Sequence, residues 1–308
     1  MAEDRRKVVM RWDIDILVRI FKNYFTFLEL TCVLAHVCRR WRAACCDLTF
    51  WNTLDLSHMR SSFIKIPQEP YVYVESRSDK QLTRTLKLSM SLSKRNTRTL
   101  IFNYNLLPTA DMGLYTAKRC PDLRRLVLPG WYRLMKNKGL FNAIRFCKNL
   151  ESLTMPSIPH PNFVFSSIAK NCKNFRELKE MGPIELLFAQ NLVQILPNIK
   201  VLSLRCNSID RDALIKILDE LKSLEVLNIS HSYLVVQKLE KNKKKLNIVK
   251  EVDDEIMDKA SKLRQFVTCM KHETCVMCQR TEKDEGIMRW YKYEEGLWKA
   301  DEINSLHL

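Results

Sequence analysis

The stretches IKVLSLRCNSI (residues 199–209) and LEVLNISHSYL (residues 224–234) carry one pattern twice, with Leu202 and Leu227 at the same place in each copy. In L-x-L the two apolar side chains point to one face of a short strand and the middle side chain points to the other face. One such strand cannot bury its apolar face alone. Copies of it must therefore stack side by side and share a continuous core.

Four earlier stretches continue the pattern toward the N-terminus, namely TRTLIFNYNLL, LRRLVLPG, LESLTMPS and FRELKEMG. The steps between the shared leucines range from 24 to 27 residues, and these leucines are Leu100, Leu126, Leu153, Leu178, Leu202 and Leu227. That period and the L-x-x-L-x-L core match a leucine-rich repeat. Between the strands, apolar residues recur at helical spacing. We therefore predict an α/β fold, a curved solenoid with short parallel strands inside and helices outside.

The repeat also explains three of the eleven cysteines. Cys120, Cys147 and Cys172 stand three residues before the next strand's first apolar residue, where later repeats have Leu196 and Leu221. A thiol that interchanges with leucine is expected to be a buried, inert core residue. One position departs from the pattern. Glu180 stands where an inward apolar residue is expected, so the fourth strand is predicted to be distorted or shifted in register.

A different rhythm precedes the repeats, in WDIDILVRIFKNYFTFLELTCVLAHVCRRWRAACCDLTFW (residues 12–51). Apolar residues mark three short amphipathic helices in about 40 residues, which is a thin core. A unit of this kind often leaves apolar surface for a partner. The alternative is a helical cap that only closes the end of the solenoid.

The order of these residues resembles an F-box, whose pattern is roughly L-P-x-E-x-L…I-F…L…V-C-R-x-W…W. Trp12 and Asp13 replace its usual Leu-Pro, and the matching residues are Asp15, Leu17, Ile20, Phe21, Leu30, Val37, Cys38, Arg39, Trp41 and Trp51. An F-box followed by leucine-rich repeats is a known class of proteins. The ending MRWYKYEEGLWKADEINSLHL is also similar to the tails of a plant subgroup of that class.

This resemblance implies a substrate receptor of an SCF-type cullin ubiquitin ligase. The F-box would dock on a Skp adaptor, and through it on cullin and RING subunits, while the repeats hold an unidentified target protein. No cofactor is implied. The adaptor-binding residues expected from the resemblance are Ile16, Leu17, Ile20, Phe21, Leu28, Leu30, Val37, Cys38, Trp41 and Trp51. The target-binding residues expected on the concave face are Arg125, Thr154, Lys179, Ser203, Arg205 and Asn228.

The C-terminal part holds one rival chemical motif, CMKHETCVMC, with ligand-type side chains three residues apart at Cys269, His272, Cys275 and Cys278. Thiolates and imidazole suit tetrahedral zinc. Two short gaps in succession do not, because zinc sites usually separate two ligand pairs widely. The spacing therefore favours a reduced thiol cluster over a metal site. The run from Lys238 to Lys250 is interpreted as a solvated charge run, with a nuclear signal or a nucleic-acid-binding patch as the alternative.

These observations predict an F-box at residues 10–52, about six to seven repeats at 53–237 with a connecting segment at 57–96, and a charged linker with a non-repeat cap at 238–308. The chain lacks a phosphate loop, G-x-S-x-G and H-E-x-x-H, so no enzyme is expected.

The composition of the chain also bears on its cellular compartment and its partners. No apolar run is long enough to span a membrane, and free cysteines without a secretory leader favour the nucleus or the cytoplasm, or both. The net charge of +16 leaves open a nucleic-acid-binding protein with a C-terminal zinc site, although nucleic acid is not the expected partner. A repeat scaffold outside the ubiquitin system is the second alternative.

Overall fold

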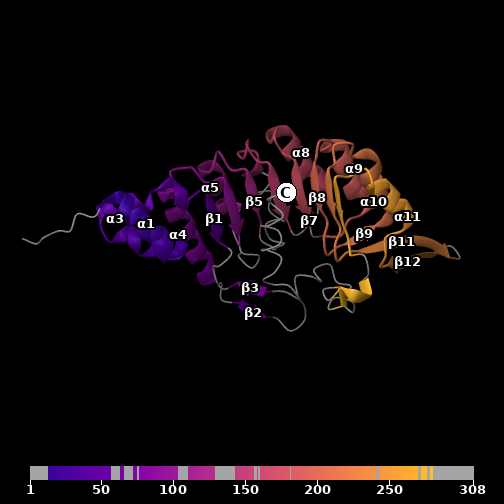
Figure 1. Ribbon diagram of the computed structural model, residues 1–308, viewed down its shortest axis with the longest axis horizontal. Coiled ribbons are helices and arrows are strands. Elements are labelled where there is room, and N and C mark those ends of the chain that lie inside the picture. Colours follow the sequence, from indigo (N-terminus) through magenta and orange to yellow (C-terminus); the bar gives the residue numbers. More distant parts are fainter. Residues whose placement is uncertain are drawn as a thin grey trace, which may run out of the picture.

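A computed structural model describes residues 13–56, 63–65, 72–74, 76–102, 110–128, 143–155, 158, 160–180, 182–240, 243–269, 272–275 and 278–279. A small helical unit forms one end of an elongated molecule, a curved sheet with helices along it forms the middle, and a hairpin projects at the other end (Figure 1). The predicted α/β solenoid is confirmed by this arrangement of parallel strands and covering helices.

The N-terminal unit consists of α1 (Ile14–Tyr24), α2 (Phe27–Cys32), η1 (Leu34–His36), α3 (Arg39–Cys45) and η2 (Leu48–Phe50). Local chemistry sets its helix starts. The Asp13 side chain accepts the N–H of Asp15, and Thr26 and Glu29 form a reciprocal capping box at α2. These caps let helices of only 6 to 11 residues form where the sequence alone would leave them marginal.

The main sheet has the strand order β1-β4-β5-β6-β7-β8-β10-β13, all parallel in the pairs that join them. Its strands are β1 (Thr53–Leu56), β4 (Thr99–Phe102), β5 (Arg125–Val127), β6 (Ser152–Met155), β7 (Glu177–Glu180), β8 (Val201–Ser203), β10 (Val226–Asn228) and β13 (Gln265–Val267). The six predicted leucines pair in a single row, extended to Leu54 at one end and Phe266 at the other. The sequence-derived register is therefore confirmed.

Helices run along one side of this sheet (Figure 1). They are α4 (Ser76–Leu92), α5 (Ala110–Arg119), α8 (Pro161–Asn171), α9 (Leu186–Ile195), α10 (Arg211–Glu220) and α11 (Asp254–Ala260). Successive helices from α8 to α11 contact one another. A small antiparallel pair, β2 (Phe63–Lys65) and β3 (Val72–Val74), lies within the segment predicted to connect the domains.

The repeat sheet continues beyond residue 237, where the sequence analysis ended it. After β10 the chain forms β11 (Tyr233–Glu240) and β12 (Lys243–Val249), an antiparallel hairpin whose β11 also pairs with β9 (Ser208–Asp210). It then forms α11 and β13, which joins the main sheet. The run 238–250, predicted to be a solvated linker, is thus largely strand. The inserted hairpin lengthens the spacing in sequence between Leu227 and Phe266 beyond the repeat period. The last repeat, LRQFV, was therefore not recognised from the sequence.

Helix α11 holds this last unit against the preceding repeat. Ile256 and Ala260 are buried, and ion pairs join α11 and its cap to α10. Arg211 Nε lies 2.6 Å from Asp253 Oδ2, and Lys259 Nζ lies 2.7 Å from Asp219 Oδ1. These ion pairs are partly exposed, so solvent screens them and each contributes little to stability. Burial of the apolar residues therefore dominates the docking.

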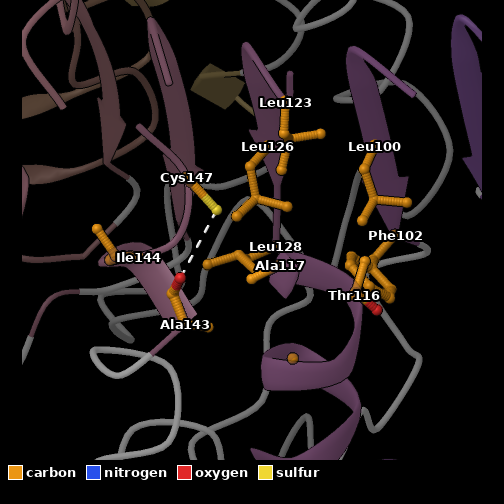
Figure 2. Close-up of a pocket in the computed structure, with 11 residues that line it drawn as sticks. Leu100, Phe102, Thr116, Ala117, Leu123, Leu126, Leu128, Ala143, Ile144 and Cys147 are labelled. Atoms are coloured by element: carbon orange, nitrogen blue, oxygen red, sulfur yellow. Dashed lines mark hydrogen bonds between the residues drawn. The ribbon is translucent and has the colours of Figure 1, made fainter. Parts of the chain in front are cut away.

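The three middle cysteines are buried in the core, as predicted from their interchange with leucine. Burial raises the pKa of Cys120 and of Cys147 to about 12, and that of Cys172 to about 11. Cys147 also lines a small apolar cavity of about 30 Å³, and its thiol donates to the Ala143 carbonyl (Figure 2). A void of this size between apolar walls is a packing defect and is far below the size of a drug-sized ligand site.

Glu180 does not shift the fourth strand, contrary to the prediction, because β7 keeps the common register with β6 and β8. Its buried carboxylate instead binds the backbone of neighbouring turns. Glu180 Oε1 accepts the N–H groups of Ile158 at 2.9 Å and Gly182 at 3.3 Å. Burial nevertheless dominates and raises the pKa of Glu180 from 4.5 to about 8.

Replacing Cys147 with Ala should lower the free energy of unfolding by about 1–2 kcal/mol, because it enlarges an existing apolar void. Urea denaturation measures this difference. Cys32→Ala is the matched control, since Cys32 is exposed, and should leave the midpoint unchanged. In the native protein Cys32 and Cys38 should also react with a thiol reagent before Cys147 does. The reverse order of labelling would contradict its burial.

Replacing Glu180 with Gln should change how stability depends on pH. A raised folded-state pKa means that the folded protein holds a proton that the unfolded chain releases, so wild-type stability is lost as pH rises from about 4.5 toward 8. The amide cannot ionise but still accepts both N–H groups. The variant should therefore gain more than about 1 kcal/mol on the wild type between pH 5 and pH 8. Parallel stability curves would refute this, and the exposed Glu185→Gln should give them.

Candidate functional site

The three-helix unit has a dry aromatic centre. The ring centroids of Phe21 and Trp41 lie 5.2 Å apart in an edge-on contact, and Phe27 makes a similar contact with Trp51. Trp51 is fully buried, and its indole Nε1 donates a 2.7 Å hydrogen bond to the Cys45 carbonyl at the end of α3. Because Trp51 lies two residues before the start of β1, this bond ties the helical unit to the first strand of the solenoid.

The residues predicted to bind an adaptor divide by burial into three groups. Ile16, Val37 and Cys38 are exposed, and Ile20, Leu28 and Trp41 are partly buried. The side chains of the other four fill the core of the folded chain, so they support the helical unit from within, and the assignment of adaptor binding to all ten positions stays a prediction. These four are Leu17, Phe21, Leu30 and Trp51.

The exposed apolar residues of this unit include four that the sequence analysis did not select, namely Ile14, Tyr24, Val33 and Leu48. Among the described residues, half of the twelve large hydrophobic side chains that are exposed lie within positions 14–48, namely Ile14, Ile16, Tyr24, Val33, Val37 and Leu48. Val33 and Val37 are each 55% exposed, while Leu34 and Ala35 between them are buried. The sequence did contain a signal for these exposed residues. The stretch TCVLAHVC holds more apolar residues than the inward face of one short helix can bury. We call Ile14, Ile16, Val33, Val37 and Cys38 the apolar F-box surface.

The second predicted site, on the repeat strands, is mostly inaccessible. Thr154 and Lys179 are each 1% exposed, and Ser203 and Arg205 are also buried, whereas Arg125 and Asn228 are partly exposed. Lys179 Nζ lies 3.4 Å from Glu177 Oε1. Four of the six residues therefore cannot contact a target without a rearrangement. The assignment of target binding to these six positions stays a prediction.

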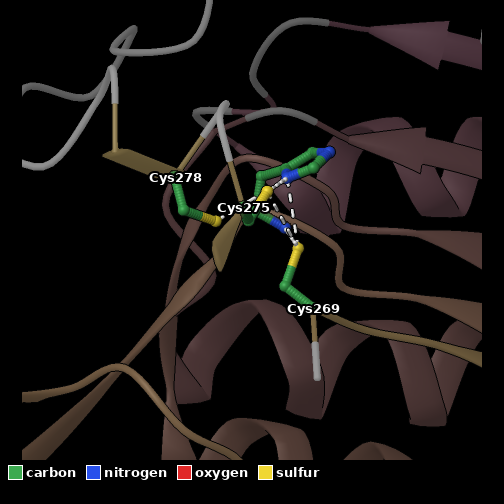
Figure 3. A group of neighbouring side chains, drawn as sticks. Cys269, Cys275 and Cys278 are labelled. Atoms are coloured by element: carbon green, nitrogen blue, oxygen red, sulfur yellow. Dashed lines mark hydrogen bonds between the residues drawn. The ribbon is translucent and has the colours of Figure 1, made fainter. Parts of the chain in front are cut away.

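A third cluster joins the turn after β10 to the C-terminal segment. His231 Nδ1 lies 3.1 Å from the sulfur of Cys269, 3.3 Å from that of Cys275 and 3.7 Å from that of Cys278. Figure 3 shows the side chains of Cys269, Cys275 and Cys278 converging on one point. The hydrogen bond with Cys278, with a smaller part from His231, holds the pKa of Cys269 far below the ordinary thiol value.

This cluster differs from the one predicted from spacing. Its nitrogen comes from His231, 38 residues before Cys269, in place of the predicted His272. His272 begins the short helix η3 (His272–Thr274), and its side chain lies outside the described residues. Local spacing could not reveal His231, because β13 brings it to the cysteines only when the sheet forms.

Comparison with known proteins agrees with both halves of the architecture. The model of the F-box-like family matches residues 14–57. An F-box/LRR-repeat protein of Arabidopsis thaliana is 63% identical over 309 residues, which cover 99% of this chain and 98% of the relative. The chain belongs to the F-box/leucine-rich-repeat family. A second Arabidopsis thaliana F-box protein is 27% identical over 330 residues, covering 95% of this chain and 94% of that protein.

Membership indicates the general role of the class. F-box domains bind Skp-type adaptors, and F-box/leucine-rich-repeat proteins act as receptors that bring targets to a ligase and are not themselves enzymes as a class. In the described part of the chain, no helix is both long enough and apolar enough to cross a membrane.

Replacing Trp51 with Phe should destabilise the F-box by about 2 kcal/mol, because the Cys45 carbonyl would lose its buried donor. The free energy of unfolding of the full chain, from urea denaturation followed by far-ultraviolet circular dichroism, measures this. Trp41→Phe is the comparison, since a phenyl ring keeps the contact with Phe21 and Trp41 is partly exposed. Equal stabilities of Trp51→Phe and the wild type would show that the indole bond contributes nothing.

Proposed function

We propose that this protein is the substrate-recognition subunit of an SCF-type ubiquitin ligase. The F-box docks on a Skp adaptor, and through it on cullin and RING subunits, while the repeats bind a target protein. The protein performs no chemistry itself. It raises the local concentration of target lysines beside the ligase.

The observation that carries this proposal is the apolar F-box surface on a folded aromatic core. A cap that only closed the solenoid would bury its apolar residues against the first repeat and present polar ones outward. Here the core residues are buried, yet Ile14, Ile16, Val33 and Val37 remain exposed. Such a surface is stabilised by a partner of matching apolar character. Exposed charges of both signs lie near these residues in the chain, with Asp13 and Asp15 on either side of Ile14 and Arg39 and Arg40 after Cys38.

Arg125 and Asn228 are the two predicted contact residues that keep exposed area, and they lie on strands β5 and β10, which are separated by three strands of the sheet. A target that reached both would span the inner part of the repeat sheet.

We place the protein in the nucleus, the cytoplasm or both, because its eleven cysteines are all free.

Replacing Val33 and Val37 together with Asp should weaken Skp binding at least about 100-fold, because two carboxylates would have to be desolvated against an apolar partner. Isothermal titration calorimetry of the full chain with a purified Skp adaptor measures the affinity. Both side chains are exposed, so the melting temperature should not fall by more than a few degrees.

Leu187→Asp is the matched control for charge on an exposed apolar position. Leu187 is 62% exposed on α9, in the middle of the solenoid, and its substitution should leave Skp affinity unchanged. Loss of binding in the control would point to nonspecific association. If the wild-type protein itself shows no binding at micromolar concentrations, the proposed function is wrong.

A further inference from the structure

We propose that His231, Cys269, Cys275 and Cys278 form a structural zinc site that fastens the C-terminal segment to the last repeats. This site is independent of the proposed ligase function. Its four ligand atoms lie within 4.8 Å of one another, although His231 and Cys278 are 47 residues apart in the chain.

The distances between the ligand atoms fit the edges of a zinc tetrahedron. With Zn–S bonds of about 2.3 Å and Zn–N bonds of about 2.05 Å, sulfur atoms lie about 3.8 Å apart and sulfur and nitrogen about 3.6 Å apart. The sulfur atoms of Cys269 and Cys275 are 3.8 Å apart, and the three sulfur–nitrogen distances are 3.1, 3.3 and 3.7 Å. Two of these four edges match the zinc values closely, two sulfur–nitrogen edges are shorter, and every edge is at most 4.8 Å, so the four ligand atoms form a compact cluster of about the size that one zinc ion requires.

A hydrogen-bonded cluster without metal explains the same arrangement poorly. The Nδ1 atom of a neutral imidazole either donates or accepts one good hydrogen bond in the ring plane. Three sulfur atoms converge on that single nitrogen of His231, which exceeds its capacity. A cation among the four atoms accounts for all three approaches at once, because each ligand then bonds to the metal and not to its neighbours.

The backbone around His231 is arranged for this role. His231 adopts a left-handed φ of 61°, as does its equivalent in the preceding repeat, Cys206, at 60°. The N–H of Cys206 donates to the Ser230 carbonyl of the next repeat, whereas the N–H of His231 donates to Cys269 Sγ at 3.2 Å. Cys269 therefore occupies in the last repeat the position that Ser230 holds in the repeat before it. Its sulfur accepts the hydrogen bond that the Ser230 carbonyl accepts in the earlier repeat. Backbone N–H donors of this kind stabilise metal-bound thiolates.

Cys275 and Cys278 supply the second of the two ligand pairs that a zinc site usually has. Cys275 and Cys278 form a C-x-x-C pair, and the N–H of Gln279 donates to the Cys275 carbonyl at 2.9 Å, closing a tight turn. The first pair is His231 with Cys269, brought together by the pairing of β10 with β13. Two pairs from separate segments are the usual construction of a structural zinc site.

The ligand set determines the class of metal and its role. Three thiolates and one imidazole favour zinc over magnesium or calcium, which bind oxygen ligands. Four protein ligands leave no open position for a substrate, so the site is structural. Binding converts three thiols to thiolates, giving a site of net charge −1 and releasing up to three protons. The metal would fix a segment that reaches the sheet through only the three residues of β13.

Metal analysis of the purified full-length chain, expressed with zinc in the medium, tests the site first. We expect one zinc ion per chain that survives dialysis, and a lower melting temperature after removal by a strong chelator. Added Zn²⁺ should restore the melting temperature and added Mg²⁺ should not. A folded wild-type protein that contains no zinc and does not respond to added Zn²⁺ would overturn the proposal.

Substitutions then test the assignment of the ligands. His231→Ala and Cys278→Ser should lose zinc, whereas His231→Cys should keep it, because four thiolates also form a zinc site. His272→Ala and the exposed-cysteine control Cys32→Ser should keep a full complement. Zinc that remains in His231→Ala but disappears in His272→Ala would refute the proposed ligand set.

Cobalt substitution of the wild-type protein provides a second readout, which needs no variant to fold, and His231→Cys adds a comparison. Wild-type protein loaded with Co²⁺ should show the intense visible bands of a tetrahedral site together with sulfur-to-cobalt charge transfer. The bands should shift in His231→Cys as sulfur replaces nitrogen. A weak octahedral spectrum in the wild type would exclude a closed site of three thiolates and one imidazole.

Discussion

The leucine row through the parallel sheet is the constraint on which the rest of this structure depends. Each strand is only three or four residues long and cannot bury its apolar face without a neighbour on both sides. Leu54, Leu100 and their successors through Leu227 pair in one register, and even Glu180 is accommodated without disturbing it. The sheet tolerates a buried carboxyl group more readily than a slip, because a one-residue slip would turn every inward leucine outward.

This constraint leaves two exposed ends, and the molecule covers them with different chemistry. At the N-terminal end, the indole of Trp51 anchors a helical unit that has an aromatic core and several exposed apolar side chains. The unit thus covers the first strand and still presents a surface to a partner. At the C-terminal end, α11 and β13 add one more repeat, reached through an inserted hairpin. Ion pairs and a small apolar contact hold this last unit, which is why an additional cross-link there would be effective.

The sequence predicted those features of the fold that depend on residues close together in the chain. The leucines, the buried cysteines and the transition at Trp51 follow from periodicity and from the order of residues in the F-box. The strand at Gln265–Val267 was missed because an inserted hairpin breaks the period. The burial of Lys179 and Arg205 could not be predicted, since an outward strand position has the same sequence signature whether it is exposed or covered. His231 was missed because its neighbours in space are 38 or more residues away in sequence.

The two proposed functional elements, the apolar F-box surface and the His231 cluster, depend on different parts of the fold. The apolar F-box surface belongs to a unit that is recognisable from its own sequence, and its exposed residues contribute nothing to the leucine row. The His231 cluster exists only when β13 is paired with β10, so its ligands report that the last repeat has formed. A metal bound there stabilises the far end of the solenoid without touching the adaptor surface. Loss of the metal should therefore loosen the end of the repeat sheet while adaptor affinity is kept, because coupling between the two ends would have to pass through every intervening strand.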